Sequence, residues 1–312
     1  MTTMTKPFQI LALGLFLAAS AVAAGAVRAE ATEVRRVTER LIPFESGGQV
    51  QIDDKNGNIT IEGWPRNEVR IQVTRVVRAE DRAKAEELIK ELQADVVVHS
   101  DRIVIESLFP KRSESVGIWD LLKNKIAQLQ IHYYVQVPNE TDLTLQTANG
   151  QVRAHGVTGK LDARTTNGDM RVEDMNGIIN LATTNGEISM AGVTNKAFAQ
   201  TTNGSVVAEI RRISPTGYVE LKTTNGNVET YLPKDIRATV DAVTTNGHVS
   251  IAFPVEREGL MTSKTVRGTI QGGGVKLSLG TTNGNVEVRK LGGGEPGKPP
   301  VKHRSGTRGG SS

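Results

Sequence analysis

The side chains best suited to chemistry in this 312-residue sequence are five histidines and a short run of charged residues. No two histidines have the spacing of metal ligands, and none shares a recognisable motif with a carboxylate. Cysteine is absent, which excludes thiolate metal sites and cysteine nucleophiles. We therefore predict no metal site and no cofactor. The histidines are His99, His132, His155, His248 and His303.

The charged run consists of Asp169, Arg171, Glu173 and Asp174, and Glu187 follows 18 residues after Asp169. Carbohydrate-cleaving β-helices need carboxylates that converge on one face. Aromatic side chains that could stack on sugars make up only 4% of the chain, which weakens that hypothesis. We interpret the run as a solvated face and predict no catalytic residue. A polysaccharide lyase or hydrolase remains the alternative.

The dominant feature is a Thr-Thr-Asn-Gly tetrapeptide that occurs six times and is preceded by one Thr-Ala-Asn-Gly variant. Glycine adopts a positive φ at little cost and asparagine is the next most tolerant residue, so each Asn-Gly predicts a corner of the chain. In a stack of equivalent coils, the asparagine amides would hydrogen bond from one coil to the next. The predicted corners are Asn149, Gly150, Asn167, Gly168, Asn185, Gly186, Asn203, Gly204, Asn225, Gly226, Asn246, Gly247, Asn283 and Gly284.

Short strands flank every corner, because apolar and polar residues alternate there with a period of two. The first threonine of each motif falls on the inward face, where we expect a second ladder of side chains; the second threonine points outward. A flat ice-binding threonine array is disfavoured, because each coil offers only one outward threonine beside a corner. The inward threonines are Thr165, Thr183, Thr201, Thr223, Thr244 and Thr281.

The repeated corners and alternating strands predict an all-β fold, namely a parallel β-solenoid of about 18 residues per coil. The main alternative is an antiparallel meander, because Asn-Gly is also a strong hairpin signal. Identical residues at an 18-residue spacing favour stacking, which places them above one another. The longer gap between Gly247 and Gly284 predicts two repeats, one of them degraded around Gly268 to Gly274.

Before the regular repeats, residues 30–138 are predicted to hold one or more coils, an insert and a cap. The insert is predicted to consist of a strand (Val69 to Val77), an amphipathic helix (Ala79 to Ala94) and a second strand (Val96 to Ile105). A second amphipathic helix would cap the solenoid and precede Pro138. Its apolar face is Ile118, Leu121, Leu122, Ile126 and Leu129. The regular solenoid then spans residues 139–291.

Both ends of the chain differ in composition from the body. Residues 1–29 are predicted to be a signal peptide cleaved after Ala29, with an uncleaved anchor over Phe8 to Val27 as the alternative. Residues 292–312 are rich in glycine, proline and basic side chains, and this composition predicts a disordered tail. The body between them carries a net charge of about −1, so nucleic acid is not an expected partner.

The sequence resembles a bacterial family of adhesin-like, extracytoplasmic repeat proteins that is formally a domain of unknown function. The resemblance rests on Asn56-Gly57-Asn58-Ile59, the insert around Ala79 to Ala94, Tyr134 to Pro138, the run of Thr-x-Asn-Gly units, and Leu277 to Val288. It implies a right-handed β-helix and a role in the cell envelope, and it carries no catalytic residues over.

We therefore expect a non-enzymatic, periplasmic or secreted protein whose partner is envelope polymer, a surface or another envelope protein. A membrane would be contacted only through an uncleaved signal segment. A stress-sensing partner of a membrane protein is a second alternative to the binding role.

Overall fold

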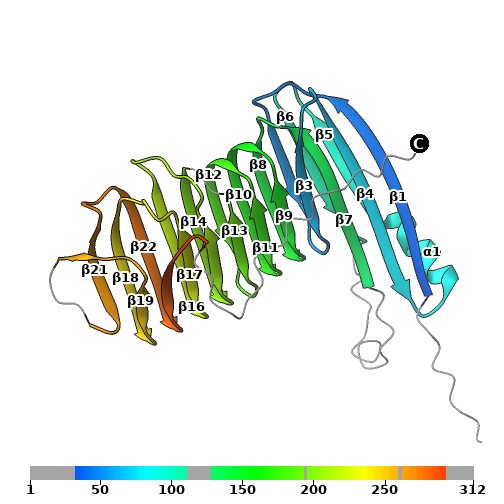
Figure 1. Cartoon of the computed structure of the whole chain (residues 1–312). Helices are drawn as coiled ribbons and strands as arrows, with labels where there is room; N and C mark the ends of the chain where they lie inside the picture. Colours follow the sequence, from blue (N-terminus) through cyan, green and yellow to red (C-terminus); the bar gives the residue numbers. More distant parts are fainter. Residues whose placement is uncertain (1–31, 111–127, 193–194, 259–261, 293–312) are drawn as a thin grey trace, which may run out of the picture. The chain divides into compact units, whose positions relative to one another are not determined.

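The computed structural model describes residues 32–110, 128–192, 195–258 and 262–292, and most of them are in β-strands (Figure 1). The strands form an eleven-stranded sheet, here sheet A, and a twelve-stranded sheet, here sheet B. One α-helix, α1 (Arg82–Glu91), is present in the described residues. The all-β class predicted from the alternating pattern is confirmed.

Each repeat places a longer strand in sheet B, turns at Asn-Gly and places a shorter strand in sheet A; we call this pair of strands a coil. The coils of the repeat region are β8 (Asp142–Asn149) with β9 (Val152–His155), β10 (Thr158–Asn167) with β11 (Met170–Glu173), β12 (Asn176–Ala182) with β13 (Ile188–Ala191), β14 (Lys196–Asn203) with β15 (Val206–Glu209), β16 (Tyr218–Asn225) with β17 (Val228–Leu232), β18 (Ala238–Asn246) with β19 (Val249–Ile251), and β22 (Val275–Asn283) with β23 (Val286–Lys290).

Neighbouring coils of the repeat pair in parallel, with like residues side by side. Leu161 in β10 is paired with Leu143 in β8 and with Ile179 in β12. The same parallel register joins the short strands, where Met170 pairs with both Val152 and Ile188. The stacking is therefore solenoid-like, and the antiparallel meander is excluded for these strands.

The first coil consists of β2 (Gln49–Asp53) and β3 (Ile59–Trp64), and it lies beside β8 and β9. On its other side lie β6 (Arg102–Leu108), parallel to β2, and β7 (Gln128–Pro138), parallel to β3. Strands that come later in the chain thus stack outside the first coil. Stacking order and chain order already differ at this end.

The predicted insert is present, with one correction. The strand β4 (Glu68–Ala79) leads to α1, whose first turn is capped because Asp81 accepts a hydrogen bond from Lys84 N. The predicted single strand Val96 to Ile105 is wrong: it is a hairpin of β5 (Gln93–Val98) and β6. Its apolar residues lie on both sides of a short turn that the alternation alone did not reveal. Sheet A ends at β1 (Thr32–Pro43), antiparallel to β4.

The C-terminal end corrects the predicted order of the coils. The last coil in the chain, β22 with β23, lies between β16–β17 and β18–β19. The segment expected to be a degraded repeat contains β20 (Glu256–Arg257) and β21 (Thr265–Ile270), which pair antiparallel. β21 covers the outer edge of β18, and this protects a strand that would otherwise expose unpaired backbone groups.

The core is one continuous cluster of buried aliphatic side chains contributed by both sheets. Leu161 and Leu181 reach it from sheet B, and Met170, Val172 and Ile188 reach it from sheet A. Side chains of opposite parity on the same strands face solvent. Each sheet therefore presents an outer face made of aligned rows of residues, one residue per strand.

Three predictions fall mostly outside the described residues. The signal peptide over residues 1–29 and all but Gly292 of the tail over residues 292–312 lie outside them. So do Ile118, Leu121, Leu122 and Ile126 of the predicted capping helix, whereas Leu129 is described and belongs to β7, so its assignment to a helix is wrong.

Candidate ligand-binding surface

The asparagines of the repeat form a ladder at the corner between the two sheets. The Asn185 amide Nδ2 donates to Asn167 Oδ1 at 2.8 Å, and Asn185 Oδ1 accepts from Asn203 Nδ2 at 2.8 Å. These bonds use one donor and one acceptor of each amide within the ladder, so we assign it a structural role. In stacking order the ladder is Asn149, Asn167, Asn185, Asn203, Asn225, Asn283 and Asn246.

The glycines of the corners are needed for a reason that the sequence did not indicate. A Cβ atom on Gly186 would lie 2.1 Å from the carbonyl oxygen of Gly168 in the next coil. Several corner glycines have no positive φ, so close stacking of backbones, rather than a left-handed conformation, is what they share. The same clash, at 1.8 to 2.1 Å, occurs at Gly150, Gly168, Gly186, Gly204, Gly226, Gly284 and Gly247.

The inward threonines are buried as expected, but they do not bond to one another. Thr201 Oγ1 donates to the carbonyl oxygen of Gly186 at 3.0 Å, and Thr223 Oγ1 donates to that of Gly204 at 2.8 Å. The threonines of neighbouring coils lie side by side, as in Thr201 beside Thr223, and their hydroxyls satisfy corner carbonyls of the neighbouring coil instead of bonding to one another. The outward threonines are exposed: Thr166, Thr184, Thr202, Thr224, Thr245 and Thr282.

The charged run lies on and beside β11, and three of its residues, Arg171, Glu173 and Asp174, form ion pairs. Arg171 pairs with Glu173 at 2.5 Å, and Asp174 lies 3.2 Å from Arg211 and 3.5 Å from His155 Nε2. Asp169 Oδ1 accepts a hydrogen bond from the Glu187 backbone N–H, so these two neighbours meet through backbone and not as paired carboxylates. The arrangement matches a solvated, ion-paired face.

The histidines are dispersed. His132 Nδ1 accepts a hydrogen bond from Asn58 N at 3.0 Å, and burial, with a smaller effect from the Arg35 charge, lowers the pKa of His132. His303 lies outside the described residues. Within the described ranges, no three histidine, aspartate or glutamate side chains are placed to hold a metal ion.

The outer face of sheet A has a shallow depression of about 330 Å³ near β3, β7, β9 and β11. Tyr134 donates its hydroxyl hydrogen to Glu62 Oε2, and Gln136 Nε2 donates to the same oxygen at 3.3 Å. Burial, reinforced by Glu62, raises the pKa of Tyr134 to about 12. This carboxylate is therefore already engaged by its neighbours, and the depression offers polar contacts.

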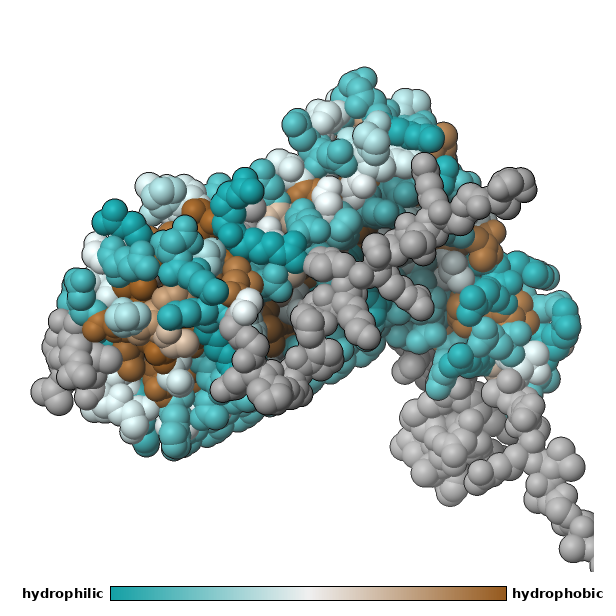
Figure 2. Space-filling view, viewed as in Figure 1, coloured by the Kyte–Doolittle hydropathy of each residue, from teal (hydrophilic) through white to brown (hydrophobic). Residues whose placement is uncertain are grey.

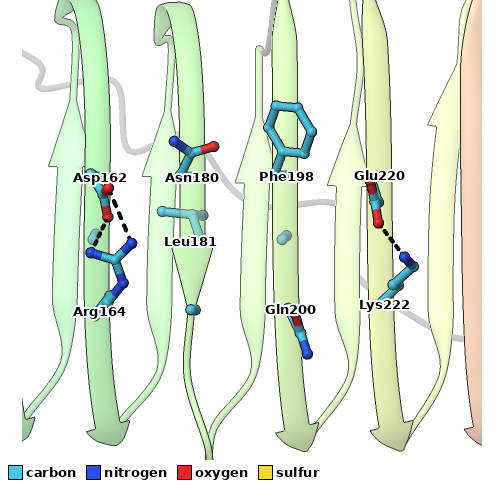
Figure 3. Close-up of a pocket in the computed structure, with 11 residues that line it drawn as sticks. Asp162, Arg164, Asn180, Leu181, Phe198, Gln200, Glu220 and Lys222 are labelled. Atoms are coloured by element: carbon cyan, nitrogen blue, oxygen red, sulfur yellow. Dashed lines mark hydrogen bonds and ion pairs between the residues drawn. The ribbon is translucent and has the colours of Figure 1, made fainter.

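The outer face of sheet B has a depression of about 220 Å³ that spans β10, β12, β14 and β16 (Figure 3). Asp162, Asn180, Phe198 and Glu220 lie side by side in it, one on each strand. Asp162 pairs with Arg164 at 2.8 Å, and Glu220 pairs with the lysine two residues further on.

The half-exposed ring of Phe198 also packs against Tyr218 with ring centroids 5.3 Å apart. An aromatic pair flanked by amide and charged groups can bind a ligand through ring faces and hydrogen bonds. The sequence alone did not indicate this site, because its residues come from successive repeats and share no motif. Their common position in the 18-residue period was the available signal.

Polar side chains cover most of the surface in Figure 2, and apolar groups gather mainly over the C-terminal coils, between the yellow and orange parts of Figure 1. Among the described residues, no helix is long and apolar enough to cross a membrane.

A comparison with protein families gives a match over residues 19–289 to the family described as Toastrack DUF4097. The chain belongs to this family. The match confirms the resemblance to adhesin-like proteins of unknown function that the Asn-Gly repeats and the insert indicated. The comparison with curated proteins found no match for this Toastrack chain.

Solved structures similar to the Toastrack chain include a putative cell adhesion protein from Clostridium sporogenes, with 14% identity, a TM-score of 0.36, and coverage of 82% of this chain and all of that one. A putative adhesin from Bacteroides fragilis has 11% identity, a TM-score of 0.31, and coverage of 82% and 97%. A putative lipid binding protein from Parabacteroides distasonis has 9% identity, a TM-score of 0.29, and coverage of 80% and 96%.

A buried polar cluster of the Toastrack chain also escaped the sequence analysis. Ser107 Oγ donates to Asp54 Oδ1 at 2.5 Å and lies 2.7 Å from the Tyr133 hydroxyl. Asp54 is 3% exposed, and burial raises its pKa to about 6, against smaller opposing effects of its hydrogen bonds. Burial likewise raises the pKa of Tyr133. The cluster joins β6, β7 and the first corner, which lie far apart in the sequence.

Proposed function

We propose that this Toastrack protein is an exported, non-enzymatic, adhesin-like module of the bacterial cell envelope. In this proposal its coils wind as a right-handed β-helix of about 18 residues per turn, and its outer faces bind envelope polymer, a surface or another envelope protein. Export rests on the signal sequence predicted over residues 1–29, which would place the folded body in the periplasm, on the cell surface or outside the cell.

The observation that carries the binding role is the way charges are arranged on the outer faces. Acidic side chains there are repeatedly neutralised by a basic residue two positions away in the sequence, which leaves few carboxylates available as a general acid or base. The pairs are Asp162–Arg164, Arg171–Glu173, Glu209–Arg211, Glu220–Lys222 and Glu287–Arg289. Such a surface suits recognition better than glycoside cleavage, which needs two carboxylates with different pKa values.

Fractionation and binding together test the proposal. The tagged full chain, expressed in a bacterial host, should be recovered outside the cytoplasm with an N-terminus near Glu30. The purified protein should sediment with isolated cell envelopes and release neither reducing nor unsaturated sugar ends from them. Cytoplasmic retention, absence of envelope binding, or sugar release abolished by Asp169→Ala or Glu187→Ala would each contradict it.

A further inference from the structure

A straight row of alternating cationic and apolar side chains crosses the outer face of sheet B. The strand register places Lys160 beside Ile178, Ile178 beside Lys196, Lys196 beside Tyr218, and Tyr218 beside Lys276. These residues belong to β10, β12, β14, β16 and β22. They point outward on the same face of sheet B as the depression in Figure 3, whose central residues come two positions later on β10, β12, β14 and β16. The last step depends on the insertion of β22, so the row exists only in the folded stack.

The lysines of this row are exposed, and within the described residues no ion pair is formed by their side chains; at one end of the row the Asp142 carboxylate accepts a hydrogen bond from the Lys160 backbone N–H at 2.7 Å. Adjacent strands lie about 4.8 Å apart, so lysines on every second strand are separated by about 10 Å. Ile178 is 39% exposed, which is unusual for an isoleucine in this fold, and Tyr218 is half-buried. The row therefore combines a regularly spaced positive charge with apolar surface between the charges. We call it the lysine row.

The neighbouring row limits what can bind. It carries Asp162 and Glu220, whose charges are balanced by Arg164 and Lys222, and Glu220 also accepts a hydrogen bond from the Tyr218 hydroxyl at 2.7 Å. Phe198 stands between them and packs on Tyr218, so aromatic surface continues from one row into the next. The positive charge is thus confined to a line that runs across the strands.

We propose that the lysine row binds a linear anionic polysaccharide whose acidic group recurs on every second sugar, with sugar rings resting on Ile178, Tyr218 and Phe198. This inference rests on the proposed binding function and specifies its ligand. A polymer with one charge per disaccharide matches lysines on alternate strands, and the apolar faces of its rings match the side chains between them.

Two other anionic partners fit less well. A nucleic acid strand carries a charge about every 3.4 Å, which is roughly three times the density of the lysine row. An anionic membrane presents charge in two dimensions, and it would meet the Asp162 and Glu220 carboxylates beside the lysines. A single polymer chain lying along the row matches the spacing of the lysines, and it meets the acidic row only at Phe198, between two carboxylates whose charges Arg164 and Lys222 balance.

Hyaluronan is a suitable probe, because it carries one carboxylate per disaccharide, and carboxyl-reduced hyaluronan is its neutral counterpart. Immobilised hyaluronan should bind the full chain, binding should weaken as salt is added, and the neutral polymer should not bind. The triple variant Lys160→Gln, Lys196→Gln, Lys276→Gln should bind about tenfold more weakly, which corresponds to about 1.4 kcal/mol in total.

The matched control is Lys90→Gln, Lys234→Gln, Lys264→Gln, which removes the same charge from exposed positions outside the row. A second variant, Ile178→Ser with Tyr218→Ser, should also weaken binding while leaving its salt dependence in place. Circular dichroism and the melting temperature of each variant separate lost binding from lost folding.

The outcomes distinguish this inference from the function on which it rests. If the parent and the triple variant bind isolated envelopes and hyaluronan equally well, the lysine row is not the site, although the binding function stands. Preference of the parent for single-stranded DNA or for phosphatidylglycerol vesicles over hyaluronan would also overturn the inference. A parent chain that binds no envelope preparation would refute the proposed function itself.

Discussion

At Gly186 the carbonyl oxygen of Gly168 occupies the space in which a side chain would begin. We expect Gly186→Ala to lower the free energy of unfolding by about 1–3 kcal/mol, because a Cβ only 2.1 Å from this oxygen forces two coils apart. Gly280→Ala is the matched control: it lies in β22 of the same stack, and its Cβ would meet nothing closer than 3.8 Å. Urea denaturation of both variants measures the difference, and equal stabilities would show that close stacking does not require glycine.

Asp54 makes stability depend on pH. Its folded pKa, about 6, lies above its ordinary value of 3.8, so between these values the folded state binds more protons than the unfolded state. The free energy of unfolding should therefore fall as pH rises from about 4 to about 6, by up to roughly 3 kcal/mol.

Asp54→Asn removes this titration. Relative to the parent, the variant should gain stability between pH 4 and pH 7.5, which denaturation at the two pH values would measure. Asp235→Asn, at an exposed position in the turn between β17 and β18, is the charge-matched control. A parent whose stability rises through this window, or a variant with the parent's pH profile, would contradict the assignment.

Among the elements, α1 is the one most dependent on local sequence. Asp81 accepts from the Lys84 N–H at 2.7 Å and satisfies a donor that the first helical turn leaves unpaired. Asp81→Ala should cost about 1 kcal/mol of stability, whereas Asp81→Asn should cost little, because asparagine also caps helices well. Thermal denaturation distinguishes them, and a loss of the same size in both variants would show that charge, not capping, is what matters.

The elements also show how far periodicity can be read. The alternation identified the strands of the repeats correctly, because residues on one face of a strand share one environment. It failed between Val96 and Ile105, where a hairpin replaces one strand, since two short apolar runs separated by Ser100 and Asp101 read as a single run with an interruption. Helix α1 was recognised because its apolar stripe, with Ala85 and Ile89 buried, follows the helical period.

For the whole molecule, the position of the last coil gives a distinctive expectation. Leu277 in β22 is buried and paired with Val219 on one side and with Val240 on the other. Leu277→Ala should cost about 2–5 kcal/mol and should speed amide hydrogen exchange in both neighbouring strands, β16 and β18. Leu161→Ala is the control, with faster exchange centred on β8 and β12. Exchange that stays slow in β16 would contradict the inserted order, because a coil at the end of the stack would touch only one neighbour.

The sequence by itself determined the strands, the corners and the parallel stacking, because these depend on residues that recur at a fixed spacing and meet their own copies. Burial of Thr201 and the ladder through Asn185 follow from that repetition alone. Tertiary structure decided what repetition leaves open. Coils with the same motif can pair in more than one order, so only the folded chain places β22–β23 before β18–β19. The Asp54 cluster and the lysine row likewise join residues with no shared motif, and their chemistry exists only once the strands lie side by side.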